Sequence, residues 1–126
     1  MKSKTKKPSK NRKRRYCAPN HRRKKFFQAK LIDDLRAEHG IRRLGIREGD
    51  HVLVIRGEFK DVEGKVSKVD RKNIRLYIEG VQIEKTGGAS YDYAIRPSDV
   101  VISKINLKKD KYRKKIIDRK EKIEFE

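Results

Sequence analysis

GDHVLVIRGEFKDVEGKV (residues 49–66) and IRLYIEGV (residues 74–81) decide the fold that the sequence predicts. Apolar residues rich in β-branching are interrupted in these stretches by Gly49, Gly57, Gly64 and Gly80. The pattern is typical of short, strongly bent strands joined by tight turns. Basic residues beside such turns suit a nucleic-acid backbone, because glycine permits close approach of a phosphate and lysine neutralises its charge.

The segment from residue 48 to residue 105 is therefore expected to form a small β barrel, and the fold class to be mainly β. Alternation of Ile74, Leu76 and Ile78 with polar or aromatic neighbours indicates a half-buried strand. Thr86-Gly87-Gly88 is typical of a hairpin turn. The strands are predicted at about 51–56, 63–70, 73–79, 81–84, 91–96 and 99–104.

Three further segments flank this barrel. Residues 1–18 are predicted to be a basic extended arm without secondary structure. Residues 19–47 are predicted to hold two short helices, at about 20–28 and 31–39, and a connector. Residues 106–126 are predicted to be a basic helical tail, with Tyr112, Ile116 and Ile123 near one apolar face.

The positive charge is concentrated at the two ends of the chain. The 126 residues carry a formal charge of +19, of which residues 1–30 contribute +14 because they contain no carboxylate. Residues 31–49 contribute 0, residues 50–105 contribute +1 and residues 106–126 contribute +4. An arm of that charge repels itself in water, so a polyanionic partner is expected to order it.

Other classes of protein fit the sequence poorly. Residues 1–25 lack the broad apolar face of a membrane-surface segment, and neither a transmembrane run nor a signal peptide is recognisable, so an intracellular protein is expected. Cys17 stands alone, which excludes an internal disulfide. His21, His39 and His51 are far apart and no phosphate-binding glycine loop is present, so we expect no metal, cofactor, small-molecule substrate or enzymatic activity.

Nucleic acid is thus the expected partner, and basic or aromatic side chains are its expected contacts. Tyr16 follows a run of cations, where it would either stack on an unpaired base or anchor the arm to the barrel. Phe59, at a turn, is a better candidate for exposure than Phe26 or Phe27, which are expected in the core. The predicted RNA-binding residues are Lys10, Arg12, Lys13, Arg14, Arg15, Tyr16, His21, Arg22, Arg23, Lys24, Arg42, Arg43, Arg56, Lys60, Lys65, Lys68, Arg71, Lys72, Arg96 and Lys114.

Three features in this order resemble one family, that of large-subunit ribosomal protein twenty-four, called twenty-six in eukaryotes. The central segment is similar to the KOW motif of ribosomal proteins and transcription elongation factors. The basic flanks resemble the archaeal and eukaryotic branch. The matching stretches are SKNRKR (residues 9–14) with APNHRRK (residues 18–24), LR (residues 35–36) through GIRRL (residues 40–44) to IREGD (residues 46–50), and the KOW segment with EGV (residues 79–81) and IRPSDV (residues 95–100).

The resemblance implies an SH3-like barrel in a structural protein of the large ribosomal subunit, and hence a cytoplasmic, ribosome-bound location. It also implies binding to the 5′ region of the large ribosomal RNA near the exit tunnel, contact with neighbouring ribosomal proteins and a role in subunit assembly. The chain departs from the family pattern at Asp61, where glycine is frequent. Aspartate tolerates left-handed geometry, so the turn is expected to persist.

Two alternatives remain. A KOW-type transcription elongation regulator would bind polymerase and nascent RNA, but is expected to need a further polymerase-binding domain that 126 residues do not accommodate. A basic protein that compacts DNA would leave the barrel unexplained. Sedimentation of a lysate distinguishes the three, because the chain would follow ribosomal subunits, polymerase or the nucleoid respectively.

Overall fold

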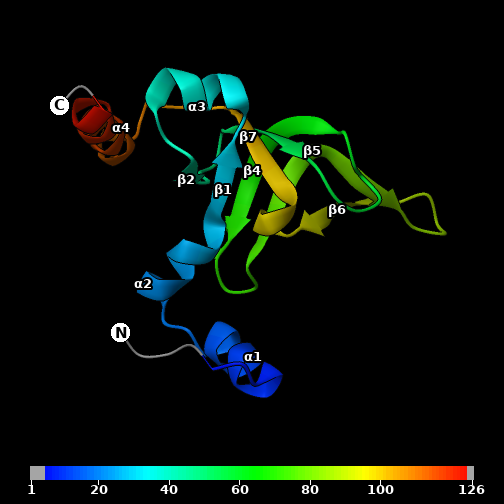
Figure 1. The fold of residues 1–126 in the computed structure, drawn as a ribbon. Coiled ribbons are helices and arrows are strands. Elements are labelled where there is room, and N and C mark those ends of the chain that lie inside the picture. Colours follow the sequence, from blue (N-terminus) through cyan, green and yellow to red (C-terminus); the bar gives the residue numbers. More distant parts are fainter. Residues whose placement is uncertain (1–4, 125–126) are drawn as a thin grey trace.

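Seven strands form one mixed sheet in the computed structural model, which describes residues 5–124 (Figure 1). They are β1 (Gln28–Leu31), β2 (Arg43–Gly45), β3 (His51–Val54), β4 (Glu63–Asp70), β5 (Arg75–Glu84), β6 (Ser90–Ile95) and β7 (Val100–Lys104). Their order across the sheet is β2-β1-β7-β3-β4-β5-β6. β1 pairs with β7 in parallel, and the other neighbouring pairs are antiparallel.

The sheet is not closed into a barrel, so the prediction of a small β barrel is confirmed only in part. The described strand order ends at β2 on one side and at β6 on the other, and these end strands do not pair. β1 and β2 extend the sheet beyond β7, with Lys30 opposite Val101 and Leu31 opposite Ile102. The architecture is therefore mixed α/β rather than mainly β, with short helices before the sheet and a helix after it.

The segment between residues 19 and 47 contains more strand than was predicted. Helical turns α2 (Asn20–Arg23) and η1 (Lys24–Phe27) and the helix α3 (Asp33–His39) match the expected helical regions. β1 (QAKL) and β2 (RLG) were missed, because segments of four and three residues are too short for their periodicity to distinguish strand from helix. Pairing decides in favour of strand: β1 pairs with β7, which buries Ala29 and Leu31 against the core, and β2 pairs with β1.

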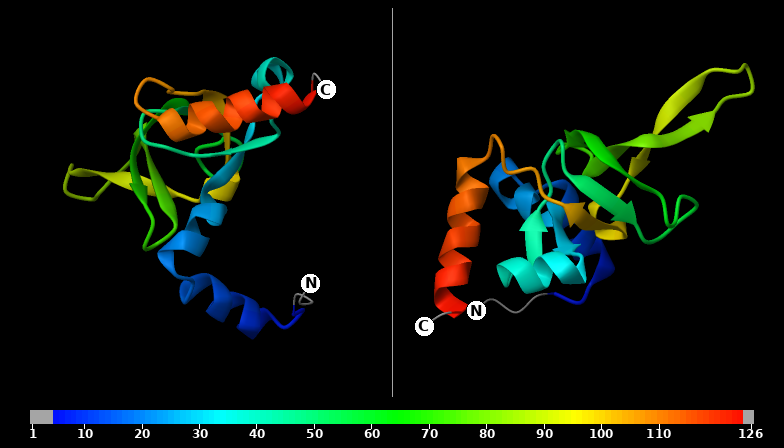
Figure 2. Two further views of the ribbon diagram at one scale, coloured as in Figure 1. Left: turned by 90° about the vertical axis from the view of Figure 1, so that its left-hand side faces the viewer. Right: turned by 90° about the horizontal axis from the view of Figure 1, so that it is seen from above.

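One bent strand replaces the two that were predicted at 73–79 and 81–84. β5 runs through Gly80, whose φ of +87° is accessible to glycine at little strain. The pairing of β5 with β6 shifts register between Tyr77 and Gln82, which is the signature of a bulge. Beyond this bulge, the far part of the β5–β6 hairpin projects from the body of the molecule (Figure 2).

The core lies along the sheet and collects the β-branched residues of the central segment. Val52, Leu76, Val81 and Ile102 have no measurable exposure. Phe27 is buried and Phe26 packs against the core, as predicted for these aromatic residues. The remaining buried members are Ala29, Leu31, Ile41, Leu44, Ile46, Val54, Val66, Ile74, Ile78, Ile95, Val100 and Ile117.

The helix α4 (Lys111–Glu124) is attached to the sheet by a buried ion pair. Arg113 donates from both terminal nitrogens to the two carboxylate oxygens of Asp50, each at 2.9 Å, and Asp50 is fully buried. Asp50 also accepts backbone N–H bonds from Arg47 and Asn106. Four donors therefore satisfy this carboxylate, as burial of a charge requires.

The buried face of α4 differs from the predicted one. Arg113 and Ile117, one helical turn apart, point inward, whereas Tyr112 is 76 % exposed and Ile123 is 62 % exposed. Apolar spacing alone pointed to a neighbouring face, because Tyr112 and Ile116 are each one position, or about 100° of helix rotation, from Arg113 and Ile117. The bidentate contact with Asp50 orients the helix instead, because an unpaired buried carboxylate would be strongly destabilising.

Gly64 is expected to tolerate no side chain. A Cβ at this position would lie 2.5 Å from the Glu79 carbonyl oxygen and 2.6 Å from Cγ2 of Ile78. Gly64→Val should therefore lower the free energy of unfolding by about 1–3 kcal/mol, measured by denaturant titration. Gly45→Val is the matched control, since nothing lies within 4 Å of its Cβ position. Equal midpoints for the Gly64 variant and the wild type would contradict the prediction.

Arg113→Met is expected to destabilise the fold by about 3–5 kcal/mol, because it leaves the Asp50 carboxylate buried without its cation. The double variant Arg113→Met with Asp50→Asn should lose less free energy of unfolding than the two single variants lose in sum, since the two side chains are coupled. Thermal or denaturant unfolding measures both effects. Arg119→Met, on an exposed part of the same helix, is the control. If Arg113→Met lowers the free energy of unfolding no more than Arg119→Met does, the ion pair is dispensable for stability.

Candidate nucleic-acid interface

The N-terminal arm is helical where extended chain was predicted. α1 (Pro8–Tyr16) begins with proline in its first turn and ends in the run Lys13, Arg14 and Arg15. Proline favours a helix start, and cations stabilise the C-terminal end of the helix dipole, so local rules support this helix despite its charge. α1 buries none of its residues, and the arm extends away from the sheet (Figure 1). Met1 to Lys4 of the predicted arm lie outside the described residues.

Arg23 holds the arm against the body. Its guanidinium group donates to the carbonyl oxygens of Ala18 at 2.7 Å, Tyr16 at 3.0 Å and Lys72 at 3.2 Å. The contact with Lys72 joins the arm to the turn between β4 and β5. These three bonds occupy the side chain within the protein, so we assign Arg23 a positioning role, and its contact with RNA stays a prediction.

The contacts at the end of α1 bear on the two interpretations of Tyr16, stacking on a base and anchoring the arm. Tyr16 is 70 % exposed at the end of α1, while Arg15 lies over the Phe26 ring with 5.7 Å between its Cζ and the ring centroid. Arg15 rather than the Tyr16 ring therefore makes the contact between the end of α1 and the body. The Tyr16 ring is accessible, which leaves stacking on a base as the interpretation that its position favours.

The turn between β4 and β5 presents cations next to α2. Asp70 accepts bonds from the backbone of Lys72 and Asn73, and from the Asn73 side chain at 2.7 Å. The Asn73 side chain is the main reason that the pKa of Asp70 is lowered, followed by the Asn73 backbone. The carboxylate thus stays charged and keeps its hydrogen bonds. This turn fixes the backbone of Arg71 and Lys72, both of which are exposed.

A groove crosses the molecule between η1, the β4–β5 turn and the start of α4. One part has a volume of 680 Å³ and the other 610 Å³. Five residues line both parts, which makes them one continuous groove: Ile46, Arg47, Val69, Arg71 and Tyr112. We call it the η1–α4 groove. It contains three predicted site residues, His21, Lys24 and Arg71.

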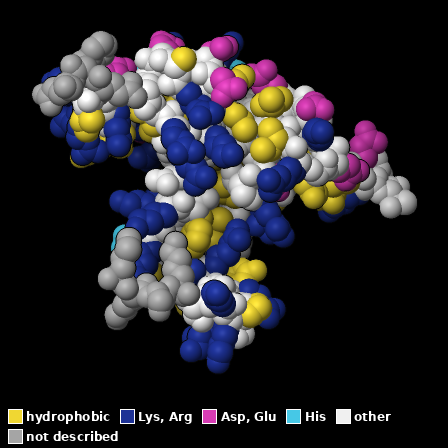
Figure 3. All heavy atoms as spheres, in the orientation of Figure 1, with side chains coloured by type: hydrophobic (Ala, Val, Ile, Leu, Met, Phe, Trp, Pro, Cys, Tyr) yellow, Lys and Arg dark blue, Asp and Glu magenta, His cyan; other side chains and the backbone are white. Residues whose placement is uncertain are grey.

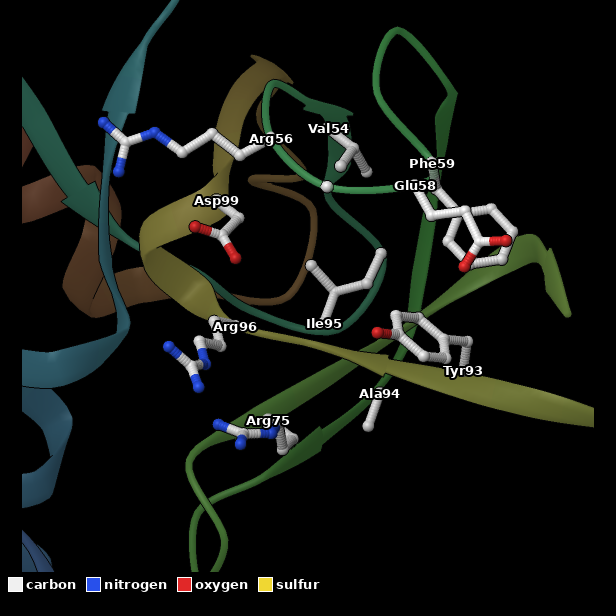
Figure 4. Close-up of a pocket in the computed structure, with 11 residues that line it drawn as sticks. Val54, Arg56, Glu58, Phe59, Arg75, Tyr93, Ala94, Ile95, Arg96 and Asp99 are labelled. Carbon is white, nitrogen blue, oxygen red and sulfur yellow. The ribbon is translucent and has the colours of Figure 1, made fainter. Parts of the chain in front are cut away.

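A second hollow, of 310 Å³, gathers three arginines from different parts of the sheet (Figure 4). Arg56 follows β3, Arg75 begins β5 and Arg96 follows β6, and Asp99 lies beside them. At its other end Phe59 packs on Tyr93, with 5.0 Å between ring centroids. Phe59 is half-buried by that contact, as Phe26 is, and it is more exposed than the buried Phe27.

The other predicted residues are spread over the surface. Arg42 and Arg43 line a third hollow with Lys120 of α4. Lys10, Arg12, Lys13 and Arg14 are exposed on α1, and Arg22 on α2. Lys60, Lys65, Lys68, Lys72 and Lys114 are exposed outside these hollows. The structure brings part of the predicted set together and leaves this remainder apart.

Sequence reasoning missed the residues that complete the η1–α4 groove. Lys25, Arg47, Lys109 and Tyr112 join it from three separate segments. Their basic or aromatic character was visible in the sequence, but only the docking of α4 onto Asp50 places them on one groove. Arg47 is partly neutralised there, because its Nε lies 3.1 Å from Asp110 Oδ2.

Charge is segregated on the surface. On the face drawn in Figure 3, Lys and Arg side chains gather over the arm and the adjoining part of the body, among several apolar patches. Asp and Glu side chains gather along the opposite edge, over α3 and the β5–β6 hairpin. Within residues 5–124 no group of three or more His, Cys, Asp or Glu could hold a metal ion. Over the same range no helix is long and apolar enough to cross a membrane.

These features define a small, strongly basic protein whose concave surfaces carry cations and aromatic rings. The family of ribosomal proteins described as L26 in eukaryotes, together with its archaeal members numbered twenty-four, matches residues 5–120. The large ribosomal subunit protein uL24 of Pyrobaculum islandicum is 46 % identical over 115 residues, which cover 91 % of this chain and 93 % of the relative. The protein of the same name from Korarchaeum cryptofilum is 43 % identical over 120 residues, covering 95 % and 91 %.

The chain therefore belongs to this family of eukaryotic L26 and archaeal uL24 ribosomal proteins. The resemblance found in the sequence is confirmed, including its archaeal and eukaryotic branch. Membership of a family of ribosomal proteins also confirms that the chain is a ribosomal protein and not an enzyme.

Proposed function

We propose that this chain is a structural constituent of the large ribosomal subunit that binds its ribosomal RNA through the arm, the η1–α4 groove and the adjoining cations. The observation that carries the proposal is a helix of nine residues, α1, that has no fully buried residue and exposes a dense array of Lys and Arg. Surface of this kind contributes little to a folded core. It is well suited to neutralise phosphates where RNA helices approach each other.

The sheet and the two terminal segments have different roles in RNA binding. The sheet over residues 48–105 recognises the shape of folded RNA with an SH3-like face, while residues 1–18 and 106–126 supply most of the excess charge. The excess of +14 within residues 1–30 supports this division, because the sheet region is nearly neutral. Ordering of the arm accompanies binding, since a helix of only nine residues with no fully buried residue is marginal in water.

The finer assignments rest on the resemblance in the sequence. We infer contact with the 5′ region of the large ribosomal RNA near the exit tunnel, contact with neighbouring ribosomal proteins, and a role in subunit assembly. The two curated relatives are named as large-subunit proteins, and both align along more than nine tenths of their length, which supports the subunit. A transcription elongation regulator is disfavoured by the same similarity.

Removal of residues 1–15 is expected to weaken RNA binding much more than it weakens folding. The segment holds nine Lys and Arg, and α1 buries no residue. Affinity for a folded fragment of large-subunit RNA should fall at least about tenfold in low salt. The free energy of unfolding should change by less than about 1 kcal/mol. A large fall in melting temperature with unchanged affinity would contradict the proposal.

The affinity should depend steeply on salt. If about 6–10 phosphates are neutralised, log affinity falls against log salt with a slope of about −5 to −9. Replacing the exposed Arg12, Lys13, Arg14 and Arg22 by Gln should flatten the slope by about 3 units. Measurements on the RNA fragment and on an unrelated duplex separate charge from shape. Equal affinity for the two RNAs at every salt concentration would exclude shape recognition by the sheet.

A further inference from the structure

The η1–α4 groove combines an apolar floor with a cationic rim. Phe27, Leu44 and Ile46 are buried beneath it, and Val69 and Ile116 add partly exposed aliphatic surface. Lys24 and Lys25 stand at one end, Arg71 in the middle and Lys109 at the other end, and all four are exposed. A flat apolar group that carries negative charge matches both surfaces at once.

Tyr112 contributes little to the packing of the fold. This residue is 76 % exposed although the next one, Arg113, is buried in the ion pair with Asp50. Within residues 5–124, the ring–ring and cation–ring contacts involve other aromatic side chains and not Tyr112. Its backbone N–H donates to Asp110 Oδ1 at 3.1 Å, and the residue lines the groove from the first turn of α4.

The acidic residues on the groove walls are engaged. Asp110 pairs with Arg47 and accepts the backbone N–H groups of Tyr112 and Arg113. Glu48 accepts the Val69 N–H at 3.4 Å. The cations that line the groove, Lys24, Lys25, Arg47, Arg71 and Lys109, outnumber the two carboxylates Glu48 and Asp110. Positive charge is therefore in excess, and the potential of the groove favours an anion.

We propose that the η1–α4 groove holds an unpaired nucleotide of the bound RNA, with its base stacked on Tyr112 and its flanking phosphates on Lys24, Lys25, Arg71 and Lys109. This inference rests on the proposed function and assigns to it a defined subsite. A paired base is covered by its neighbours in the duplex, whereas a bulged or looped base exposes the π-face that an aromatic ring stacks on. An acidic amphipathic peptide has the same charge but lacks the planar face that the free ring favours.

Binding of two RNA hairpins to the full chain tests the proposal. One hairpin carries a single unpaired 2-aminopurine as a bulge, and the other is fully paired with the same stem. The wild type should bind the bulged hairpin more tightly and quench its 2-aminopurine fluorescence. Tyr112→Ala should lose about 5- to 100-fold in affinity for the bulged hairpin, with little change for the paired one. Tyr112→Phe keeps the ring and should retain both the affinity and the quenching.

The matched control is Tyr91→Ala. Tyr91 is 44 % exposed on the β5–β6 hairpin, away from the groove, and its removal should leave both affinities unchanged. Replacement of Lys24 and Lys25 together by Gln should weaken binding of both hairpins and reduce the salt slope by about 1–2 units. Thermal melting of each variant checks that folding is intact, as expected for exposed positions.

Three results would overturn the subsite. Wild-type affinity of Tyr112→Ala for the bulged hairpin would remove Tyr112 from RNA binding. An equal loss on both hairpins would show a general contact rather than an unpaired nucleotide. Binding of an amphipathic peptide of Glu and Leu that depends on Tyr112, together with RNA binding that does not, would assign the groove to a protein. The proposed function itself fails only if the wild type binds neither hairpin nor the ribosomal RNA fragment.

Discussion

The buried contact between Asp50 and Arg113 is the interaction on which the arrangement of this protein depends. It joins the start of the central sheet to the C-terminal helix, which are 63 residues apart in sequence. The Asp50 carboxylate also holds the backbone at Arg47 and Asn106, so one side chain organises three segments. A buried charge with this many bonds is costly to disturb, because each lost donor leaves part of the charge unsatisfied. The orientation of α4 follows from it.

That orientation determines where the interaction surface lies. With Arg113 and Ile117 turned inward, Tyr112 is left at the edge of the groove beside Arg71 of the β4–β5 turn. Arg23 acts similarly on the other side, where its bond to the Lys72 carbonyl brings the arm to the same turn. Arg113 and Arg23, whose guanidinium groups are both bonded within the protein, thus bring together cations from three remote segments. The exposed cations are then free to meet a polyanion.

The neutral sheet and the basic extensions serve different physical purposes. Residues 50–105 have a net charge of +1 and supply most of the buried β-branched residues, so their stability depends little on the partner. The arm has a surplus of charge and no buried side chain within α1, so its order depends on an anion that neutralises it. Removal of the arm should therefore weaken RNA binding, whereas damage to the core should lower stability.

Much of this could be predicted from the sequence, because it follows from local chemistry. Glycine spacing and apolar alternation determined the strands of the central segment, charge counting determined the polyanionic partner, and Asp61 adopts the left-handed turn expected of it, with φ of +68°. The tertiary structure alone decided that residues 28–31 and 43–45 are strands, that the sheet stays open, and which face of α4 is buried. Those outcomes depend on long-range pairing with β7 and on the partner of Asp50, and neither leaves a periodic signal in the local sequence.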